Sequence, residues 1–136
     1  MMILGVDFGD SRTGYATSDA LGFSAHTLEV YSEKNMQKVA QHTAELAKNL
    51  KAEKIVLGFP KNMNGTVGDR GKKTKRFATI VRELTGLEVV LWDERLTTVS
   101  AHNLMNETNV RGKKRKETVD RVAAAFILQA YLDSNK

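Results

Sequence analysis

The sequence contains no cysteine, only one proline and no apolar run long enough to cross a bilayer. The lack of cysteine excludes disulfides and thiolate metal sites, so any metal must be held by oxygen or histidine ligands. A membrane span needs roughly 20 apolar residues, and the first residues lack the basic segment and long apolar run of an export signal. We therefore expect a cytoplasmic protein with no membrane partner.

The chain of 136 residues, 41% of them hydrophobic, is long enough for one compact α/β core and too short for two ordinary domains. We expect a single domain over residues 1–136. The net charge of +5 suits a polyanionic partner. The excess is concentrated in two clusters, which are Lys72, Lys73, Lys75 and Arg76 in the first and Arg111, Lys113, Lys114, Arg115 and Lys116 in the second.

Hydrophobic periodicity predicts the order of helices and strands. The antiparallel start and the later strands separated by helices predict an α/β fold with a mixed five-stranded sheet flanked by helices. In that sheet the first three strands form an antiparallel meander, and strands four and five are parallel. The predicted strands are residues 3–7, 15–18, 25–31, 54–59 and 88–92, and the predicted helices are 35–50, 72–84, 97–106 and 118–133, with a loop at 62–68.

Asp7 ends the first predicted strand, between Gly5 and Gly9. Glycines on both sides allow a sharp turn and a close approach by another group, so the carboxylate faces whatever binds at the strand end. The structural alternative is an aspartate that hydrogen-bonds its own turn, which is common for this residue. From this motif alone the two interpretations weigh equally.

Glu94 follows the last predicted strand, at the edge where open α/β sheets place ligands. Asp93 and Glu94 point to opposite sides of a continuing strand, so we expect only one of them to share a site with Asp7. The alternative is a surface pair between Glu94 and Arg95, worth about 0–1 kcal/mol. Taken alone, that alternative is somewhat favoured.

Asp120 opens a predicted helix that is otherwise almost entirely apolar. A carboxylate on the inward face of a buried helix needs a cation or hydrogen-bond donors, and Ala123 and Ala124 leave room for the strands. Against this, an acid in a first helical turn stabilises the macrodipole by about 0.3–1 kcal/mol. We favour the functional interpretation.

Carboxylates from two strand ends and one helix can converge on a hard divalent cation, Mg²⁺ or Mn²⁺. Two such ions about 3.5–4 Å apart support phosphodiester cleavage by activated water. We therefore predict a two-metal-ion nuclease with Asp7, Glu94 and Asp120 as catalytic and metal-binding residues. The basic residues just before the last predicted helix would hold phosphates beside this site, although a solubilising loop is the alternative. The predicted nucleic-acid-binding residues are Arg12, Lys72, Lys73, Arg76, Arg95, Arg111, Lys113, Lys114, Arg115 and Lys116.

Two other sites are disfavoured. His26, His42 and His102 form no metal-binding spacing, and we expect ordinary surface or boundary residues. The segment from Gly58 to Gly68 lacks the Gly-Lys-Ser/Thr ending of a P-loop.

The sequence resembles the YqgF family, whose members are named as Holliday junction resolvases and as pre-16S rRNA nucleases. The resemblance covers nearly the whole chain and implies an RNase H-like fold, with Asp7, Glu94 and Asp120 at the positions of that family's acidic triad. The motifs that carry it are Gly5-Val6-Asp7-Phe8-Gly9, Arg12-Thr13-Gly14, Gly58-Phe59-Pro60, Asn64-Gly65, Asp93 to Thr98, Lys114-Arg115-Lys116, Val119-Asp120 and Ala123-Ala124.

The resemblance implies processing of the 5′ end of pre-16S rRNA in ribosome biogenesis, with structured RNA as the partner. One alternative is resolution of four-way DNA junctions in recombination and repair, which needs a two-fold dimer. Another is a catalytically silent nucleic-acid-binding module in transcription. The first residues also resemble the phosphate motif of actin-like ATPases and sugar kinases, which need a second domain. We expect a monomer or a weak homodimer.

Overall fold

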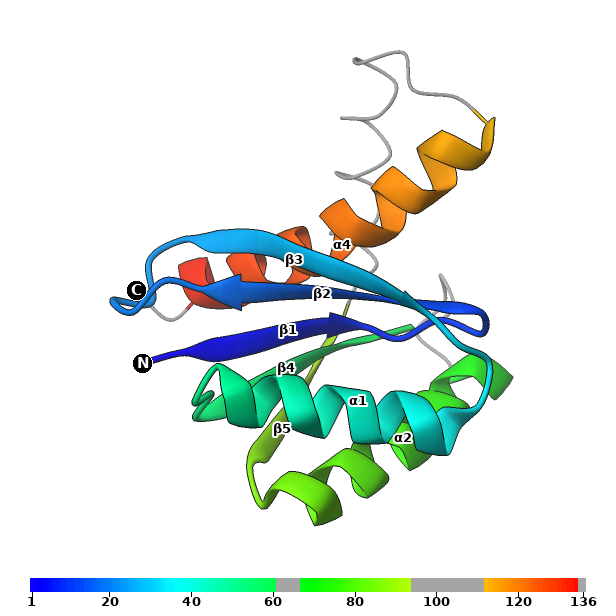
Figure 1. Ribbon diagram of the computed structural model, residues 1–136, viewed down its shortest axis with the longest axis horizontal. Helices are drawn as coiled ribbons and strands as arrows, with labels where there is room; N and C mark the ends of the chain where they lie inside the picture. The colour runs from blue at the N-terminus through cyan, green and yellow to red at the C-terminus, as the bar shows by residue number, and fades with distance from the viewer. Residues whose placement is uncertain (61–66, 94–111, 135–136) are drawn as a thin grey trace.

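The computed structural model describes residues 1–60, 67–93 and 112–134, with the backbone alone described over 112–121. The strands are β1 (Ile3–Asp7), β2 (Arg12–Ser18), β3 (Ala25–Ser32), β4 (Lys54–Phe59) and β5 (Glu88–Asp93), and the helices are α1 (Met36–Asn49), α2 (Asp69–Thr85) and α4 (Gly112–Ser134). One five-stranded sheet separates α1 and α2 on one face from α4 on the other (Figure 1). Within these residues, no helix combines the length and apolar character that crossing a membrane requires.

The sheet order is β3-β2-β1-β4-β5. The pairs β1–β2 and β2–β3 are antiparallel, whereas β4 is parallel to both β1 and β5. This confirms the predicted mixed sheet. The second strand begins at Arg12, three residues before the predicted start, and it pairs with β1 as far as Gly14 opposite Asp7.

Alternation along the strands divides the core into two parts, one on each face of the sheet. Leu4 and Val6 belong to the cluster covered by α1 and α2, whereas Ile3 belongs to the cluster covered by α4. The fourth strand is buried from Ile55 to Phe59, as its continuous apolar run predicts for a strand covered on both faces.

Helix α1 begins as predicted, because the Asn35 side chain accepts a hydrogen bond from the Lys38 backbone N–H. The helical period predicts an apolar stripe of Met36, Val39, Ala40, Thr43, Ala47 and Leu50. The buried residues of α1 confirm most of it; they are Val39, Ala40, Thr43 and Ala47. Helix α2 begins at Asp69, three residues before its predicted start, and ends at Gly86, whose φ of 70° fits a glycine stop. The helical period predicts an apolar stripe on α2 made of Phe77, Ile80, Val81 and Leu84. Its inclusion of Leu84 is wrong, since this residue is 46% exposed.

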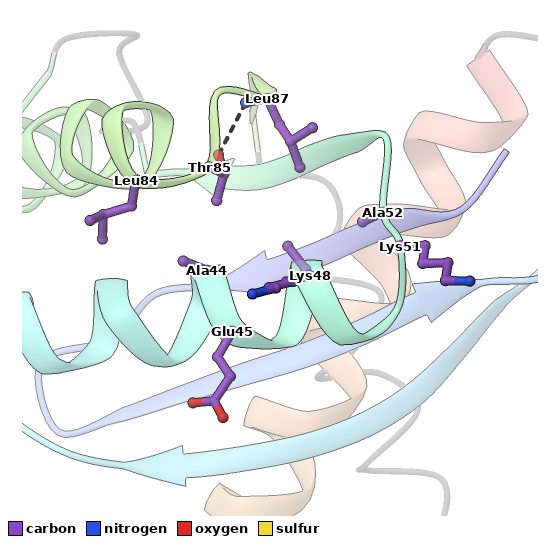
Figure 2. Close-up of a pocket in the computed structure, with 9 residues that line it drawn as sticks. Ala44, Glu45, Lys48, Lys51, Ala52, Leu84, Thr85 and Leu87 are labelled. Atoms are coloured by element: carbon purple, nitrogen blue, oxygen red, sulfur yellow. Dashed lines mark hydrogen bonds between the residues drawn. The ribbon is translucent and has the colours of Figure 1, made fainter.

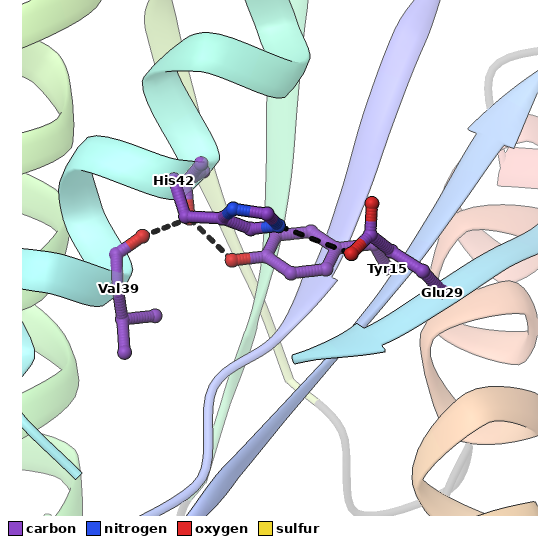
Figure 3. Close-up of polar contacts among 5 residues, drawn as sticks. Tyr15, Glu29, Val39 and His42 are labelled. Atoms are coloured by element: carbon purple, nitrogen blue, oxygen red, sulfur yellow. Dashed lines mark hydrogen bonds and ion pairs between the residues drawn. The ribbon is translucent and has the colours of Figure 1, made fainter. Parts of the chain in front are cut away.

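Polar contacts attach α1 to the first strands (Figure 3). Tyr15 lies 2.7 Å from the Thr43 hydroxyl, which itself donates to the Val39 carbonyl, so the Tyr15 hydroxyl acts as the donor. Burial raises the pKa of Tyr15 well above its ordinary value. His42 pairs with Glu29 at 3.1 Å, which is an ordinary boundary role as predicted.

Candidate functional site

The carboxyl ends of β1, β4 and β5 meet at one edge of the sheet, because the three strands are parallel. Asp7 is the last residue of β1, Phe59 of β4 and Asp93 of β5. Phe59 and Asp93 are register partners. We call this the carboxyl edge of the sheet.

Asp7 is half-buried at this edge and lies opposite Gly14. The chain then turns through residues 8–11 and enters β2. A Cβ atom on Gly9 would collide with the backbone carbonyl of Arg12, so the turn needs glycine at this point. The predicted sharp turn after Asp7 is confirmed.

Helix α4 lies close against β1 at Gly5. A Cβ atom on Gly5 would lie 2.8 Å from the Leu128 Cβ and 3.2 Å from the Ala124 carbonyl oxygen. Asp7 follows Gly5 by two residues and therefore lies on the same face, the face that α4 covers. In β5, Trp92 packs on this face, and the alternation assigns Asp93 to the other.

Asp120 lies in α4, but not where the sequence suggested. The helix begins at Gly112 rather than near Thr118, so Asp120 is more than two turns inside it. The first turn of α4 contains no acid. The alternative explanation of Asp120 as a first-turn acid is therefore wrong.

The predicted basic loop before this helix is also wrong. The four residues from Lys113 to Lys116 belong to the first turns of α4. Lysine and arginine have good helix propensity. The charge of this run therefore gives no reason for the helix to begin only at Thr118. Figure 1 shows that these turns extend beyond the carboxyl edge.

Three predicted site residues lie outside the described residues: Glu94, Arg95 and Arg111. The same holds for His102, expected to be an ordinary residue, and for the predicted helix at 97–106. Most of the loop at 62–68 also lies outside them. Among the described side chains, no three His, Cys, Asp or Glu residues form a metal-binding group. Asp7 is the one member of the predicted acidic triad whose side chain belongs to that set.

The first basic cluster lies beside the carboxyl edge. Lys72, Lys73 and Arg76 are exposed on α2, and Lys73 pairs with Asp10 in the turn after Asp7 at 3.5 Å. Arg12, the first residue of β2, is half-buried at the same edge. Four of the predicted nucleic-acid-binding residues therefore come from α2 and the start of β2, the two elements that border the turn after Asp7.

Arg70 belongs to this group, and sequence reasoning missed it. Its guanidinium donates to the Phe8 carbonyl at 3.4 Å, directly after Asp7. The predicted helix begins at Lys72 and therefore does not include Arg70. With the observed start at Asp69, Arg70 and Lys73 are three residues apart on one helix and therefore neighbours on its surface.

A pocket of about 620 Å³ lies away from these residues, between the last turns of α1 and α2 (Figure 2). Alanines and leucines form much of its lining, together with Glu45, Lys48 and Lys51. It contains none of the predicted site residues.

The chain is similar to known proteins over almost its full length. A family model described as "RuvX: Holliday junction resolvase" matches residues 1–134. A protein of Agathobacter rectalis named "Putative pre-16S rRNA nuclease" is 50% identical, with 98% of this chain and 95% of that protein covered.

Solved structures agree on the fold. The structure of RuvC from T. thermophilus in complex with a Holliday junction substrate has a TM-score of 0.57 at 13% identity, with 97% of this chain and 96% of that chain covered. The fowlpox virus Holliday junction resolvase has a TM-score of 0.59 at 15% identity, with 98% and 99% covered. These confirm the predicted RNase H-like fold, and the family match agrees with the predicted nuclease function. The chain belongs to the RuvX family, which is the YqgF family that its sequence motifs resemble.

Proposed function

We propose that this protein is a divalent-metal-dependent, two-metal-ion nuclease that uses Asp7, Glu94 and Asp120 and processes the 5′ end of pre-16S rRNA in the cytoplasm. The observation that carries the proposal is the register of α4 on β1. Ala124 and Leu128 pack on Gly5, while Ile3, Tyr131 and Leu132 line one pocket at the other end of the strand. Helix and strand therefore run in opposite directions.

This register supports a shared site for Asp7 and Asp120. Two residues along a strand span about 6.6 Å, and four residues along a helix span about 6 Å. The step from Gly5 to Asp7 thus matches the step from Ala124 back to Asp120. Positions 120, 124 and 128 also lie on one stripe of a helix.

The donor set suits a hard cation. Asp7 supplies carboxylate oxygen at the carboxyl edge, and the chain has no cysteine to favour a softer metal. We propose that Asp7, Glu94 and Asp120 hold the ions. When bound, Mg²⁺ or Mn²⁺ supplies an activated water and neutralises charge on the phosphate. The turn at Gly9 fixes the direction of the chain after Asp7 and thereby supports the position of its carboxylate.

The name of the Agathobacter relative supports RNA as the substrate, because the likeness to it is high over the full length. A specific observation favours the second candidate, cleavage of four-way DNA junctions: the family model carries the resolvase description. Resolution of a junction needs two sites related by a two-fold axis. A monomer in solution would therefore favour the RNA substrate.

The test compares the wild type with Asp7→Asn and with a matched control, Asp93→Asn. Asp93 lies at the same edge of the sheet but on the opposite face by strand alternation. The substrates are a 5′-extended 16S rRNA fragment, a four-way DNA junction and a single strand, each with Mg²⁺, with Mn²⁺ or with EDTA.

We expect Asp7→Asn to reduce cleavage by at least about 100-fold, since loss of a ligand exceeds the 10- to 100-fold effect of an outer-sphere change. The thermal unfolding midpoint should change little, and Asp93→Asn should retain cleavage. Equal cleavage by wild type and Asp7→Asn, or cleavage unaffected by EDTA, would overturn the metal mechanism.

A further inference from the structure

The first half of α2 exposes five cations: Arg70, Lys72, Lys73, Lys75 and Arg76. We call these residues the basic flank of α2. Gly71 and Thr74 between these cations, and Phe77 just after them, are buried, and Phe77 belongs to the core cluster of the sheet. Asp69 is the single acid in the same stretch, so the flank has a strong positive charge.

Three contacts fix the flank beside the turn that follows Asp7. Arg70 donates to the Phe8 carbonyl at 3.4 Å, and Lys73 pairs with Asp10 at 3.5 Å. The Phe8 ring stacks on Phe77 of α2 with centroids 4.2 Å apart and planes within 9°. The flank is therefore held next to the turn by polar and apolar contacts together.

The flank also reaches the end of β4. The Lys75 ammonium lies 5.7 Å from the centroid of the Phe59 ring, a distance at which a cation is attracted to an aromatic face. Phe59 is the last residue of β4, next to β1 in the sheet. Figure 1 shows the beginning of α2 at the same side of the molecule as the β1–β2 turn. The cations thus extend along the carboxyl edge from β1 to β4.

The ion pair between Lys73 and Asp10 is open to solvent. The two side chains are 50% and 69% exposed, and ion pairs of this kind are weak. A phosphate group that approaches the edge competes with Asp10 for the same ammonium group. Competition of this kind would make Asp10 lower the affinity of the flank for a polyanion.

We propose that the basic flank of α2 binds the sugar–phosphate backbone of the nucleic acid whose scissile phosphate lies at Asp7, and that Lys73 exchanges Asp10 for a substrate phosphate. This inference rests on the proposed function, and it names the surface that delivers the substrate to the site. Charge complementarity selects the partner, because backbone phosphates are read without base contacts.

The first experiment measures binding at several salt concentrations in the Asp7→Asn background without divalent metal. The probe is a double-stranded stem from the 16S rRNA precursor. Three double variants are compared: Arg70→Gln with Lys73→Gln, Lys72→Gln with Arg76→Gln, and the control Lys48→Gln with Arg82→Gln. Each removes two positive charges, but the control residues lie near the ends of α1 and α2, away from the flank.

For duplex DNA, each phosphate contact makes the slope of log K against log salt about 0.9 more negative, and a value of the same order applies to a double-stranded RNA stem. We expect both flank variants to make this slope less negative by about 1.8 if each lost cation contacts one phosphate, while the control leaves it unchanged. The Lys72 and Arg76 pair distinguishes phosphate binding from a structural role, because the contacts to the turn come from Arg70 and Lys73. Equal slopes for flank and control variants would overturn the proposal.

A double-mutant cycle tests the exchange at Lys73. Asp10→Asn should tighten binding by about twofold to fivefold, the factor that an exposed ion pair can supply. In the Lys73→Gln background the same change should give little gain. A gain that persists in full without Lys73 would show that Asp10 acts by general repulsion, which overturns the exchange.

Cleavage is measured in a separate experiment, with the wild-type protein that retains Asp7. If the wild type fails to cleave while the flank variants still make the salt slope less negative, the proposed function fails and the binding surface stands. If the wild type cleaves and the slopes do not change, the flank proposal fails and the nuclease stands.

Discussion

Leu128 of α4 packs directly on the backbone of Gly5 in β1. A Cβ atom at residue 5 would lie 2.8 Å from the Leu128 Cβ and 3.2 Å from the Ala124 carbonyl oxygen. Both atoms are close to the helix backbone, so a rotamer change cannot move them aside. The absence of a side chain at residue 5 therefore sets the distance between α4 and the sheet.

Gly5→Ala should destabilise the protein by about 1–3 kcal/mol, the usual effect of an extra methyl group in a packed core. The added methyl group pushes α4 away from β1 at a point four residues from Asp120. Cleavage should therefore fall even at temperatures well below unfolding. Denaturant unfolding gives the free energy, and turnover at 20 °C below the midpoint gives the activity. An unchanged unfolding curve would contradict the close approach.

Much of the fold follows from local pattern. Apart from the early start of β2 at Arg12, the predicted strands and α1 agree with the structure, because alternation and the 3.6-residue period have clear signals there. Leu84 shows where the pattern fails, since it continues the apolar stripe of α2 and yet is 46% exposed. It lies in the last turn of α2, at the pocket between α1 and α2. The packing of one helix end against another is a tertiary property that periodicity does not report.

The site was less accessible to sequence reasoning than the fold. The turn after Asp7 is predictable because glycines mark it, and Gly9 indeed has no room for a Cβ atom. Arg70 was missed because its significance depends on a contact with Phe8, 62 residues earlier. The basic run at Lys113 was taken for a loop because charge indicates exposure and does not distinguish a helix from a loop. The catalytic and metal-binding roles of Asp7, Glu94 and Asp120 stay predictions.

Lowering the pH should destabilise the turn between β2 and β3, because it protonates the Asp19 carboxylate. The Phe23 backbone N–H donates to the Asp19 carboxylate at 2.9 Å, and this bond lowers the pKa of Asp19 below its ordinary value of 3.8. Because the folded-state pKa is depressed, the stabilisation is complete above the unfolded pKa and is lost as the pH falls through the folded value.

Asp19→Asn should therefore reduce the fall in unfolding midpoint between pH 5 and pH 2.5. Thermal unfolding across that range measures the effect. Glu83→Gln is the control, because it also removes one exposed carboxylate, from α2. If Asp19→Asn and Glu83→Gln give the same pH profile, the turn contact contributes nothing.

Lys51→Gly should stabilise the protein by about 0.5–1 kcal/mol, because Lys51 holds a φ of 55° that glycine adopts without steric cost. Lys51 follows the end of α1, where its N–H donates to the Lys48 carbonyl and the Ala52 N–H donates to the Ala47 carbonyl, the bonds of a Schellman motif. Lys48→Gly is the control, since it lies inside α1 and should destabilise by about 1 kcal/mol. Urea unfolding of both variants decides the matter: destabilisation by Lys51→Gly would contradict the left-handed conformation.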